Sequence, residues 1–205
     1  MSEEFKIEIG LTEKPKFYQI HACLRCVSEP QGLGKSECGS IIEKLKEEYE
    51  GDENINDYLC LIMIRLRIKK GTERQIFMKD FYNNVTKLGR GLSYLNRKLK
   101  GGARAILCMI LLKSLNSGLI GEQDEIHLEA SGDLEDDIGN QKDMMGLVKY
   151  YQHLGFKITN DDNLEEQLSN LSVYMSGVVG TLLNKCNEDE NKISPELRRI
   201  IEQIK

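Results

Sequence analysis

Hydrophobic and polar residues alternate along several short segments of the chain, which is the pattern of half-buried β-strands. The first two such segments are 5–11 and 16–27. An unbroken apolar run at 58–68 predicts a buried strand, and 74–82 is a plausible partner for it. The alternation returns at 125–131. We expect these segments to be strands of one sheet.

Caps and longer apolar runs predict helices between and after these strands. Ser40 and Glu43 form a capping-box pattern at the start of 40–50. A long apolar run that stops at Gly118 predicts a helix over 101–118. Two more helices are predicted at 144–155 and at 194–205, with Ser194 as cap and Pro195 as first helical residue, and two short strands at 156–159 and 171–179. The order is mixed α/β, and the simplest architecture is one sheet with helices on both faces.

Length and composition are those of a soluble globular protein with one domain over 1–205, 40% hydrophobic and 30% charged residues. The longest apolar run, 105–112, is too short to span a membrane, and the acidic first residues do not resemble a signal peptide. The six cysteines are scattered, several in apolar runs, where reduced thiols behave as small hydrophobic residues. We therefore expect no membrane association and a reducing compartment, the cytoplasm or the nucleus.

The net charge of −5 conceals two segments of opposite sign. Between Arg65 and Lys113, lysines and arginines outnumber acids by thirteen to two. Between Glu122 and Asp137 there are eight acids and no lysine or arginine. Such a pattern suits a protein that binds an anionic ligand and a cationic one, although solvated surfaces of both signs give it too.

A glycine pair precedes the longest apolar helix and is the most suggestive site. Gly101 and Gly102 bring bare backbone N–H groups and the positive end of a helix to one point. Lys98, Lys100 and Arg104 add positive charge there, as at a pyrophosphate site. The alternative is a turn in which the glycines only permit a tight bend.

The order of these elements resembles the GNAT superfamily of acetyl-CoA-dependent N-acetyltransferases. The family signature is Gln/Arg-x-x-Gly-x-Gly/Ala at a strand-to-helix turn, then a strand, a helix with a tyrosine, and Gly-Phe. Residues 98–103 match with Lys98 in place of Gln or Arg, and Tyr151 with Gly155 and Phe156 matches the later part. Residues 173–183 resemble the closing strand of the family. The similarity is strongest over 90–182, and it implies one mixed, mainly antiparallel sheet.

The resemblance implies that the chain transfers an acetyl group from acetyl-CoA to a primary amine of a cationic acceptor, a polyamine or a lysine side chain. Tyr151 would protonate the departing thiolate, and Glu129 is a candidate base or amine ligand. Acetyl-CoA would bind at the turn residues Lys98, Leu99, Lys100, Gly101, Gly102, Ala103 and Arg104. The acceptor would bind near Glu129, Asp133, Glu135, Asp136 and Asp137. No metal is implied, and a homodimer is open.

Several alternatives stay open at this stage. Gly155 at C′ would place Phe156 against Tyr151, so Tyr151 can be a packing residue of the helix end. Gly89 and Gly91 offer a second glycine turn. His127 shares a strand face with Glu129, as a second possible base or as a surface residue. The chain could also be an inactive GNAT-like binding module, or bind nucleic acid through 65–113.

Two other motifs are weaker. Residues 32–36 resemble part of a P-loop, but the pattern requires glycine where the chain has Glu29. His21, Cys23, Cys26 and Cys38 suggest zinc, but Cys23 and Cys26 lie within an alternating strand pattern and no second close ligand pair follows.

Overall fold

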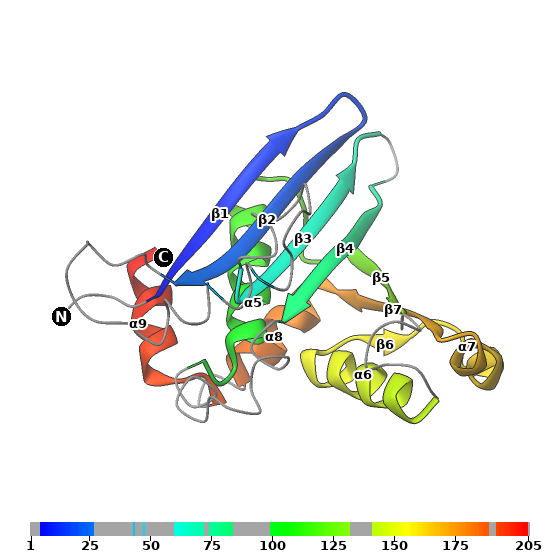
Figure 1. Cartoon of the computed structure of the whole chain (residues 1–205). Helices are drawn as coiled ribbons and strands as arrows, with labels where there is room; N and C mark the ends of the chain where they lie inside the picture. Colours follow the sequence, from blue (N-terminus) through cyan, green and yellow to red (C-terminus); the bar gives the residue numbers. More distant parts are fainter. Residues whose placement is uncertain are drawn as a thin grey trace.

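The structure is a computed structural model, and it describes residues 5–26, 43, 47, 60–71, 74–83, 99–131, 141–188 and 192–204. The described strands form one seven-stranded sheet in the order β1-β2-β3-β4-β5-β7-β6 (Figure 1). Their bounds are β1 Phe5–Glu13, β2 Phe17–Cys26, β3 Ile62–Lys69, β4 Ile76–Asn83, β5 Glu125–Ser131, β6 Lys157–Ile158 and β7 Ser172–Val178. All neighbouring pairs are antiparallel except β4 and β5, which are parallel. The predicted mixed α/β class with a mainly antiparallel sheet is confirmed.

Five α-helices and one 3-10 helix accompany the sheet in the described ranges. Their bounds are α5 Gly102–Asn116, α6 Gln141–Leu154, the 3-10 helix Asp161–Asn163, α7 Leu164–Ser169, α8 Val179–Glu188 and α9 Pro195–Ile204. Helix α5 packs against β2 and β3, and α8 and α9 pack against α5 (Figure 1). None of the helices in these ranges is long and apolar enough to cross a membrane. The helix predicted over 40–50 lies almost wholly outside the described residues.

Helix α5 is the centre of the hydrophobic core. Leu107, Ile110 and Leu111 are completely buried, as are Ile64 and Leu66 of β3. A helix that is apolar nearly all round is buried nearly all round. The strands over α5 turn alternate residues toward it. In β3 the first three residues, 62–64, are all buried, in agreement with the unbroken apolar run of its sequence.

The sequence predicted most element positions, and it missed α7 and α8. The closing strand predicted over 171–179 is confirmed as β7, which ends one residue earlier, at Val178. The rest of the stretch 173–183 that resembles the closing strand of the family is helical. The backbone N–H groups of Val179 and Gly180 donate to the carbonyls of Asp124 and Glu122, so the chain leaves the sheet there. The buried residues Val179, Leu182 and Cys186 then follow the spacing of a helix.

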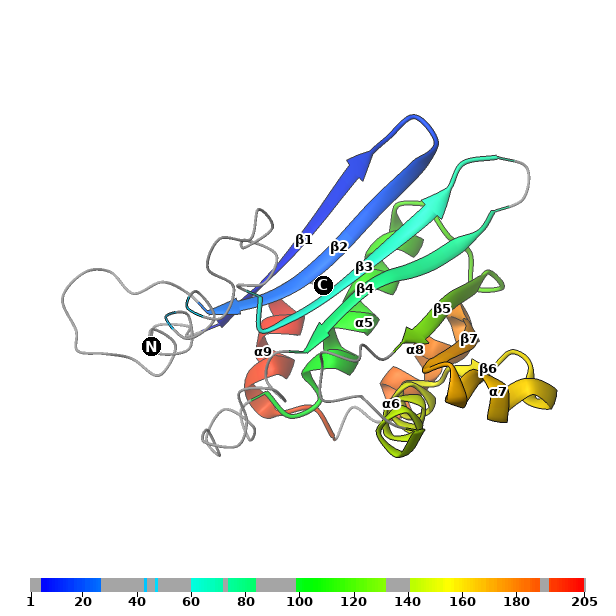
Figure 2. The same cartoon turned by 45° about the vertical axis from the view of Figure 1, so that its right-hand side comes forward.

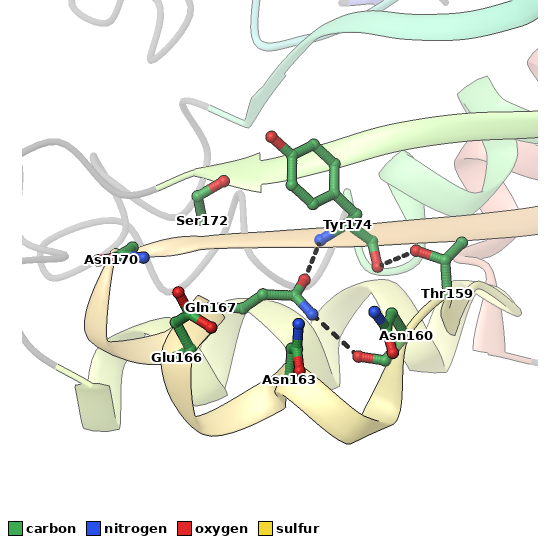
Figure 3. A pocket seen from close by; sticks show the side chains of 8 residues that line it. All are labelled: Thr159, Asn160, Asn163, Glu166, Gln167, Asn170, Ser172 and Tyr174. Atoms are coloured by element: carbon green, nitrogen blue, oxygen red, sulfur yellow. Dashed lines mark hydrogen bonds between the residues drawn. The ribbon is translucent and has the colours of Figure 1, made fainter.

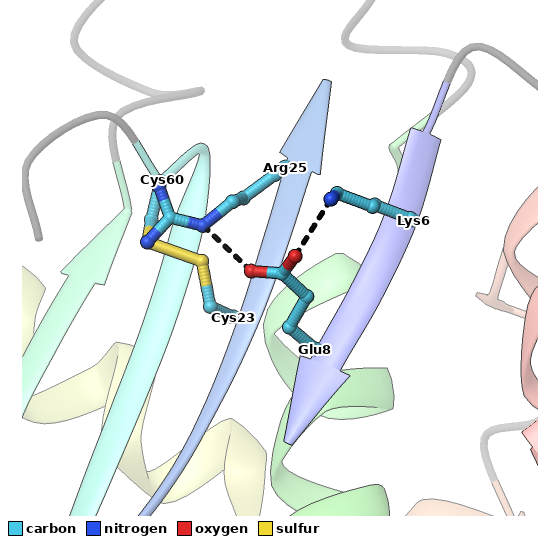
Figure 4. The surroundings of a disulfide bond; sticks show 5 residues. All are labelled: Lys6, Glu8, Cys23, Arg25 and Cys60. Carbon is cyan, nitrogen blue, oxygen red and sulfur yellow. Dashed lines mark ion pairs between the residues drawn. A yellow bond between two sulfur atoms is a disulfide. The ribbon is translucent and has the colours of Figure 1, made fainter. Parts of the chain in front are cut away.

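Cys23 and Cys60 form a disulfide whose Cα atoms are 6.0 Å apart (Figure 4). The two cysteines and Met63 make a small buried cluster beside the main core. On the same side of β1 and β2, Glu8 pairs with Lys6 and Arg25. The expectation that the cysteines act as reduced thiols is therefore wrong for Cys23 and Cys60, because the β2–β3 pairing brings together residues far apart in sequence.

Gly101 and Gly102 are required by packing at the start of α5. Gly101 has φ 78°, and a Cβ there would lie 2.9 Å from the Ile193 Cα. A Cβ on Gly102 would lie 2.5 Å from the Ile62 Cδ1. The segment before α9 is fixed on this turn by the Ser194 N–H, which donates to the Lys100 carbonyl at 3.0 Å. These contacts account for both glycines without a ligand.

We predict that Gly102→Ala lowers the free energy of unfolding by about 1–3 kcal/mol, because the new methyl group overpacks against Ile62. Ile62→Val removes the clashing Cδ1, so the double variant should lose less than the sum of the two single variants. The matched control is Gly146→Ala in α6, where a Cβ meets nothing within 4 Å. It should gain about 0.5–1 kcal/mol. Urea unfolding of the four variants measures both effects, and equal values for the two alanine variants would contradict the packing account.

Candidate functional site

The parallel strands β4 and β5 are paired at only one end. Their pairing consists of Ile76 with Ile126 and Phe77 with His127. Beyond Phe77 and His127 the two strands part (Figure 2). A parallel pair that separates inside a sheet leaves backbone N–H and C=O groups turned toward the gap, where a ligand can bind them.

A cleft of about 200 Å³ occupies this gap. One wall comes from β4, the other from β5, and Tyr151 of α6 lies between them. The lining residues are Met78, Lys79, Asp80, Phe81, Leu128, Glu129, Ser131 and Tyr151. Two of the residues predicted from sequence, Tyr151 and Glu129, thus meet in one cleft.

The end of helix α6 places Tyr151 there. Gly155 has φ 107°. Its N–H donates to the Gln152 carbonyl at 3.0 Å, and the Phe156 N–H donates to the Tyr151 carbonyl at 3.1 Å. These two bonds form a Schellman motif, and Phe156 packs on Tyr151 edge to face with ring centroids 6.1 Å apart. The packing interpretation of Tyr151 is confirmed, and Tyr151 also lines the cleft.

Tyr151 belongs to a group of aromatic rings on the helix side of the cleft. The rings of Phe81 and Tyr150 lie 5.8 and 5.9 Å from its ring. Tyr151 itself is 7% exposed. Burial raises the pKa of Tyr151 well above its usual value, and the nearby Tyr150 adds to the shift. The phenol is therefore protonated at every pH at which the protein would act.

Glu129 is the carboxylate of the β5 wall. It lies on an exposed position of β5, and its Oε1 accepts a hydrogen bond from the Ser172 hydroxyl at 2.6 Å. His127 lies on the same strand face, as predicted, but where β4 and β5 are still paired, and its ring is 5.9 Å from Phe77. Glu129 lines the cleft and His127 does not. Asp80 lines it from the opposite strand, bound to Arg65 at 2.7 Å.

In the predicted cofactor turn, most of the described residues are buried or packed against neighbours, and Lys100 is exposed. Leu99 is buried, Gly101 and Gly102 pack against neighbouring residues, Ala103 is buried, and Lys100 is exposed. Arg104 is buried, and its Nη2 donates to the His153 carbonyl at 2.6 Å in the last turn of α6. This arginine therefore connects α5 to the helix of Tyr151 instead of pointing to solvent. Lys98 lies outside the described residues.

Several predicted residues lie outside the described part of the chain. These are Asp133, Glu135, Asp136 and Asp137 of the acidic segment, the alternative Gly89 and Gly91, and residues 32–36 of the partial P-loop. The basic segment is partly described. Its Arg65, Lys70 and Arg74 pair with Asp80, Glu13 and Asp124 of the protein itself.

Sequence reasoning missed Phe81, Asp80 and Ser131 as lining residues of the cleft. Ser131 and Glu129 occupy alternate positions of the same strand, so the period of two could have identified Ser131. Phe81 and Asp80 could not be found this way, because a register shift between Arg65 and Leu66 changes the pairing of β4. Comparison with protein-family models, curated proteins and solved structures found no match to this chain.

The raised pKa of Tyr151 predicts a specific pH dependence of stability. The folded state favours the neutral phenol, so this stabilisation is complete below the unfolded-state pKa near 10 and is lost as pH rises above it. Between pH 10 and 12, the free energy of unfolding of the wild type should fall by up to about 1.4 kcal/mol per pH unit more than that of Tyr151→Phe. Urea unfolding across this range measures the difference. If the free energy of unfolding changed with pH in the same way in both proteins, Tyr151 would ionise as readily in the folded protein as in the unfolded chain.

Proposed function

We propose that the chain is an acetyl-CoA-dependent N-acetyltransferase of the GNAT type that acts on a primary amine of a cationic acceptor, a polyamine or a lysine side chain. The observation that carries the proposal is the meeting of Tyr151 and Glu129 in the cleft where β4 and β5 part. The mixed, mainly antiparallel sheet agrees with the fold class that the resemblance implies.

The unpaired edges of β4 and β5 suit the extended, amide-containing arm of acetyl-CoA. Each amide of such an arm offers one hydrogen-bond donor and one acceptor. It can therefore pair with the free N–H and C=O groups of an unpaired strand edge. The cleft would then hold the thioester between the two strands. The turn that precedes α5 and holds Lys100 is the proposed position of the pyrophosphate. Lys98, outside the described residues, belongs to the same sequence motif.

The chemistry joins the amine nitrogen to the acetyl carbon while the carbon–sulfur bond breaks and its electron pair stays on sulfur. Tyr151 would give its proton to this sulfur, and its phenolate would recover a proton, directly or through water, from the attacking nitrogen, which loses one as the amide forms. Burial raises the pKa of Tyr151, so the phenol keeps its proton until the thiolate forms. Most of the acceleration would come from holding both reactants in position.

Glu129 would remove a proton from the acceptor amine, which is mostly protonated at neutral pH. An alkylamine with pKa near 10.4 is uncharged in about one molecule in 2,500 at pH 7, a deficit of roughly 4.6 kcal/mol. A carboxylate at the cleft can hold the ammonium and accept its proton directly or through water. The Ser172 hydroxyl fixes one oxygen of Glu129 and leaves the other to face the acceptor.

The second candidate is a GNAT-like binding module without catalysis. It is favoured by the turn at 99–104, where the glycines and Arg104 have structural partners. The test that separates the two is thiol release from acetyl-CoA with spermidine, a lysine peptide and a monoamine. Release that depends on the amine supports the enzyme, and no release with any amine, although coenzyme A binds, supports the module.

We predict that Tyr151→Phe lowers turnover by about 10²-fold or more with little change in acetyl-CoA affinity, because the ring and its packing remain and only the acid is lost. The control is Tyr150→Phe, one residue earlier on α6, which should stay within about threefold of wild type. Steady-state kinetics with one amine measures both variants. Equal turnover in the wild type and Tyr151→Phe would reduce Tyr151 to its packing role.

The proposed pyrophosphate position can be tested by reversing a charge near the turn. Substitution of Gly101 or Gly102 is unsuitable for this test, because a side chain there would disturb packing. Lys100→Glu should weaken coenzyme A binding by about tenfold at low salt, with a smaller effect as ionic strength rises. Lys113→Glu reverses the same charge in the last turn of α5, at the end of the helix far from Lys100, and it should leave the affinity nearly unchanged. Calorimetry at two salt concentrations checks this. Similar losses in both variants would place the phosphates elsewhere.

A further inference from the structure

A second hollow lies at the sheet edge beyond the cleft (Figure 3). Its volume is about 570 Å³, within the range of small-molecule sites. It is lined by residues of β7, of α7 and of the chain before α7, namely Thr159, Asn160, Asn163, Glu166, Gln167, Asn170, Ser172 and Tyr174. The lining contains no aliphatic side chain, no lysine and no arginine.

Hydrogen bonds fix the floor of this hollow. The Gln167 Oε1 accepts from the Tyr174 N–H at 2.9 Å, and its Nε2 donates to the Asn160 carbonyl at 2.9 Å. The Thr159 backbone N–H and hydroxyl both donate to the Tyr174 carbonyl. The side chain of Gln167 thus pairs with the backbone of β7 at Tyr174, beyond the end of β6. The hollow is a formed feature of the edge and not a gap between loosely placed side chains.

Polar groups at the rim are left available for a ligand. Asn163 is the residue before α7, yet its side chain makes no cap hydrogen bond, although asparagine is among the preferred capping residues. Among the described residues, the side chains of Asn160 and Asn170 bind no other group. The carboxylate of Glu166 completes a set of carboxamides and one acid around the same space.

Tyr174 supplies an aromatic surface at the border of the hollow. It is 54% exposed, one of few large apolar side chains on the described surface. In Figure 3 its ring projects above β7, whereas Glu166 and Gln167 of α7 and Asn163 of the preceding 3-10 helix lie below β7. An exposed tyrosine beside a polar hollow offers a flat apolar face and a hydroxyl to a bound molecule.

The lining distinguishes between classes of ligand. A phosphate or carboxylate would find no cation among the lining residues, and an aliphatic ligand would find no aliphatic side chain and only the Tyr174 ring as a large apolar surface. A polyamine would find a single carboxylate in the lining. Carboxamides, hydroxyls and one carboxylate pair with neighbouring hydroxyl groups, and the tyrosine ring packs on a face of C–H groups. A sugar ring carries both neighbouring hydroxyl groups and a face of C–H groups.

We propose that this hollow binds a neutral polyhydroxylated ligand, a sugar ring packed on Tyr174 and hydrogen-bonded by Asn163 and Glu166. The proposal does not depend on acetyl transfer. The hollow adjoins the cleft, because Ser172 of its lining donates to Glu129 of the cleft wall.

The test is saturation-transfer NMR of the full chain, without acetyl-CoA, against the methyl glycosides of glucose, galactose and mannose and against N-acetylglucosamine. Cyclohexylmethanol serves as a ring of similar size without the hydroxyls, and spermidine as a cationic competitor. We expect at least one sugar to receive saturation mainly at the protons of one ring face, and neither control compound to displace it.

Variants assign the signal to the hollow. Tyr174→Ala should abolish it, Tyr174→Phe should keep it, and Asn163→Ala should raise the Kd by about fivefold or more, the effect of one lost hydrogen bond. Asn116→Ala, an exposed asparagine at the end of α5, is the control for Asn163 and should bind as wild type. Circular dichroism melts confirm that each variant is folded. No sugar signal, a sugar displaced by spermidine, or folded Tyr174→Ala and Asn163→Ala proteins that bind as wild type would each overturn the proposal.

Discussion

The parallel contact between β4 and β5 is the constraint on which the site depends. Two residue pairs join strands that otherwise separate, so two antiparallel groups of strands are held together at one end and open at the other. The opening is stable because neither group relies on it for its core. Helix α5 fills the space beneath β2 and β3, while α6 lies against β5. The cleft is therefore built into the sheet and is not a gap between mobile loops.

Arg104 couples the two sides of this arrangement. Its guanidinium reaches from the first turn of α5 to the carbonyl of His153, two residues after Tyr151. A cation at the end of a helix interacts favourably with the negative end of the helix dipole. Cys186 of α8 adds a thiol contact to the Arg104 carbonyl. The helix that carries Tyr151 is thus held to the helix at the centre of the core, and the position of the hydroxyl follows from packing far outside the cleft.

The sequence predicted the strands and long helices because their periods and caps are local. Gly118 and Gly155 both end helices where expected, and Ser194 accepts the Leu197 N–H as a cap. Tyr151 and Glu129 were identifiable because their motifs lie within one helix end and one strand. What the sequence did not show depends on contacts between distant segments: the Cys23–Cys60 disulfide, the packing of Ile193 on Gly101, and the shifted register that brings Phe81 to the cleft. Contacts between distant segments leave no periodic or capping pattern in the local sequence from which they could be predicted.

Hydrogen–deuterium exchange with and without coenzyme A tests the central claim most directly. If the arm of the ligand binds between the separated strands, it will protect their free N–H groups, so exchange should slow in peptides covering 78–81 and 128–131. Peptides from β2 and β3, which are paired with a neighbouring strand on both sides, should be unaffected. Coenzyme A that binds without slowing exchange at 78–81 and 128–131 would contradict the account.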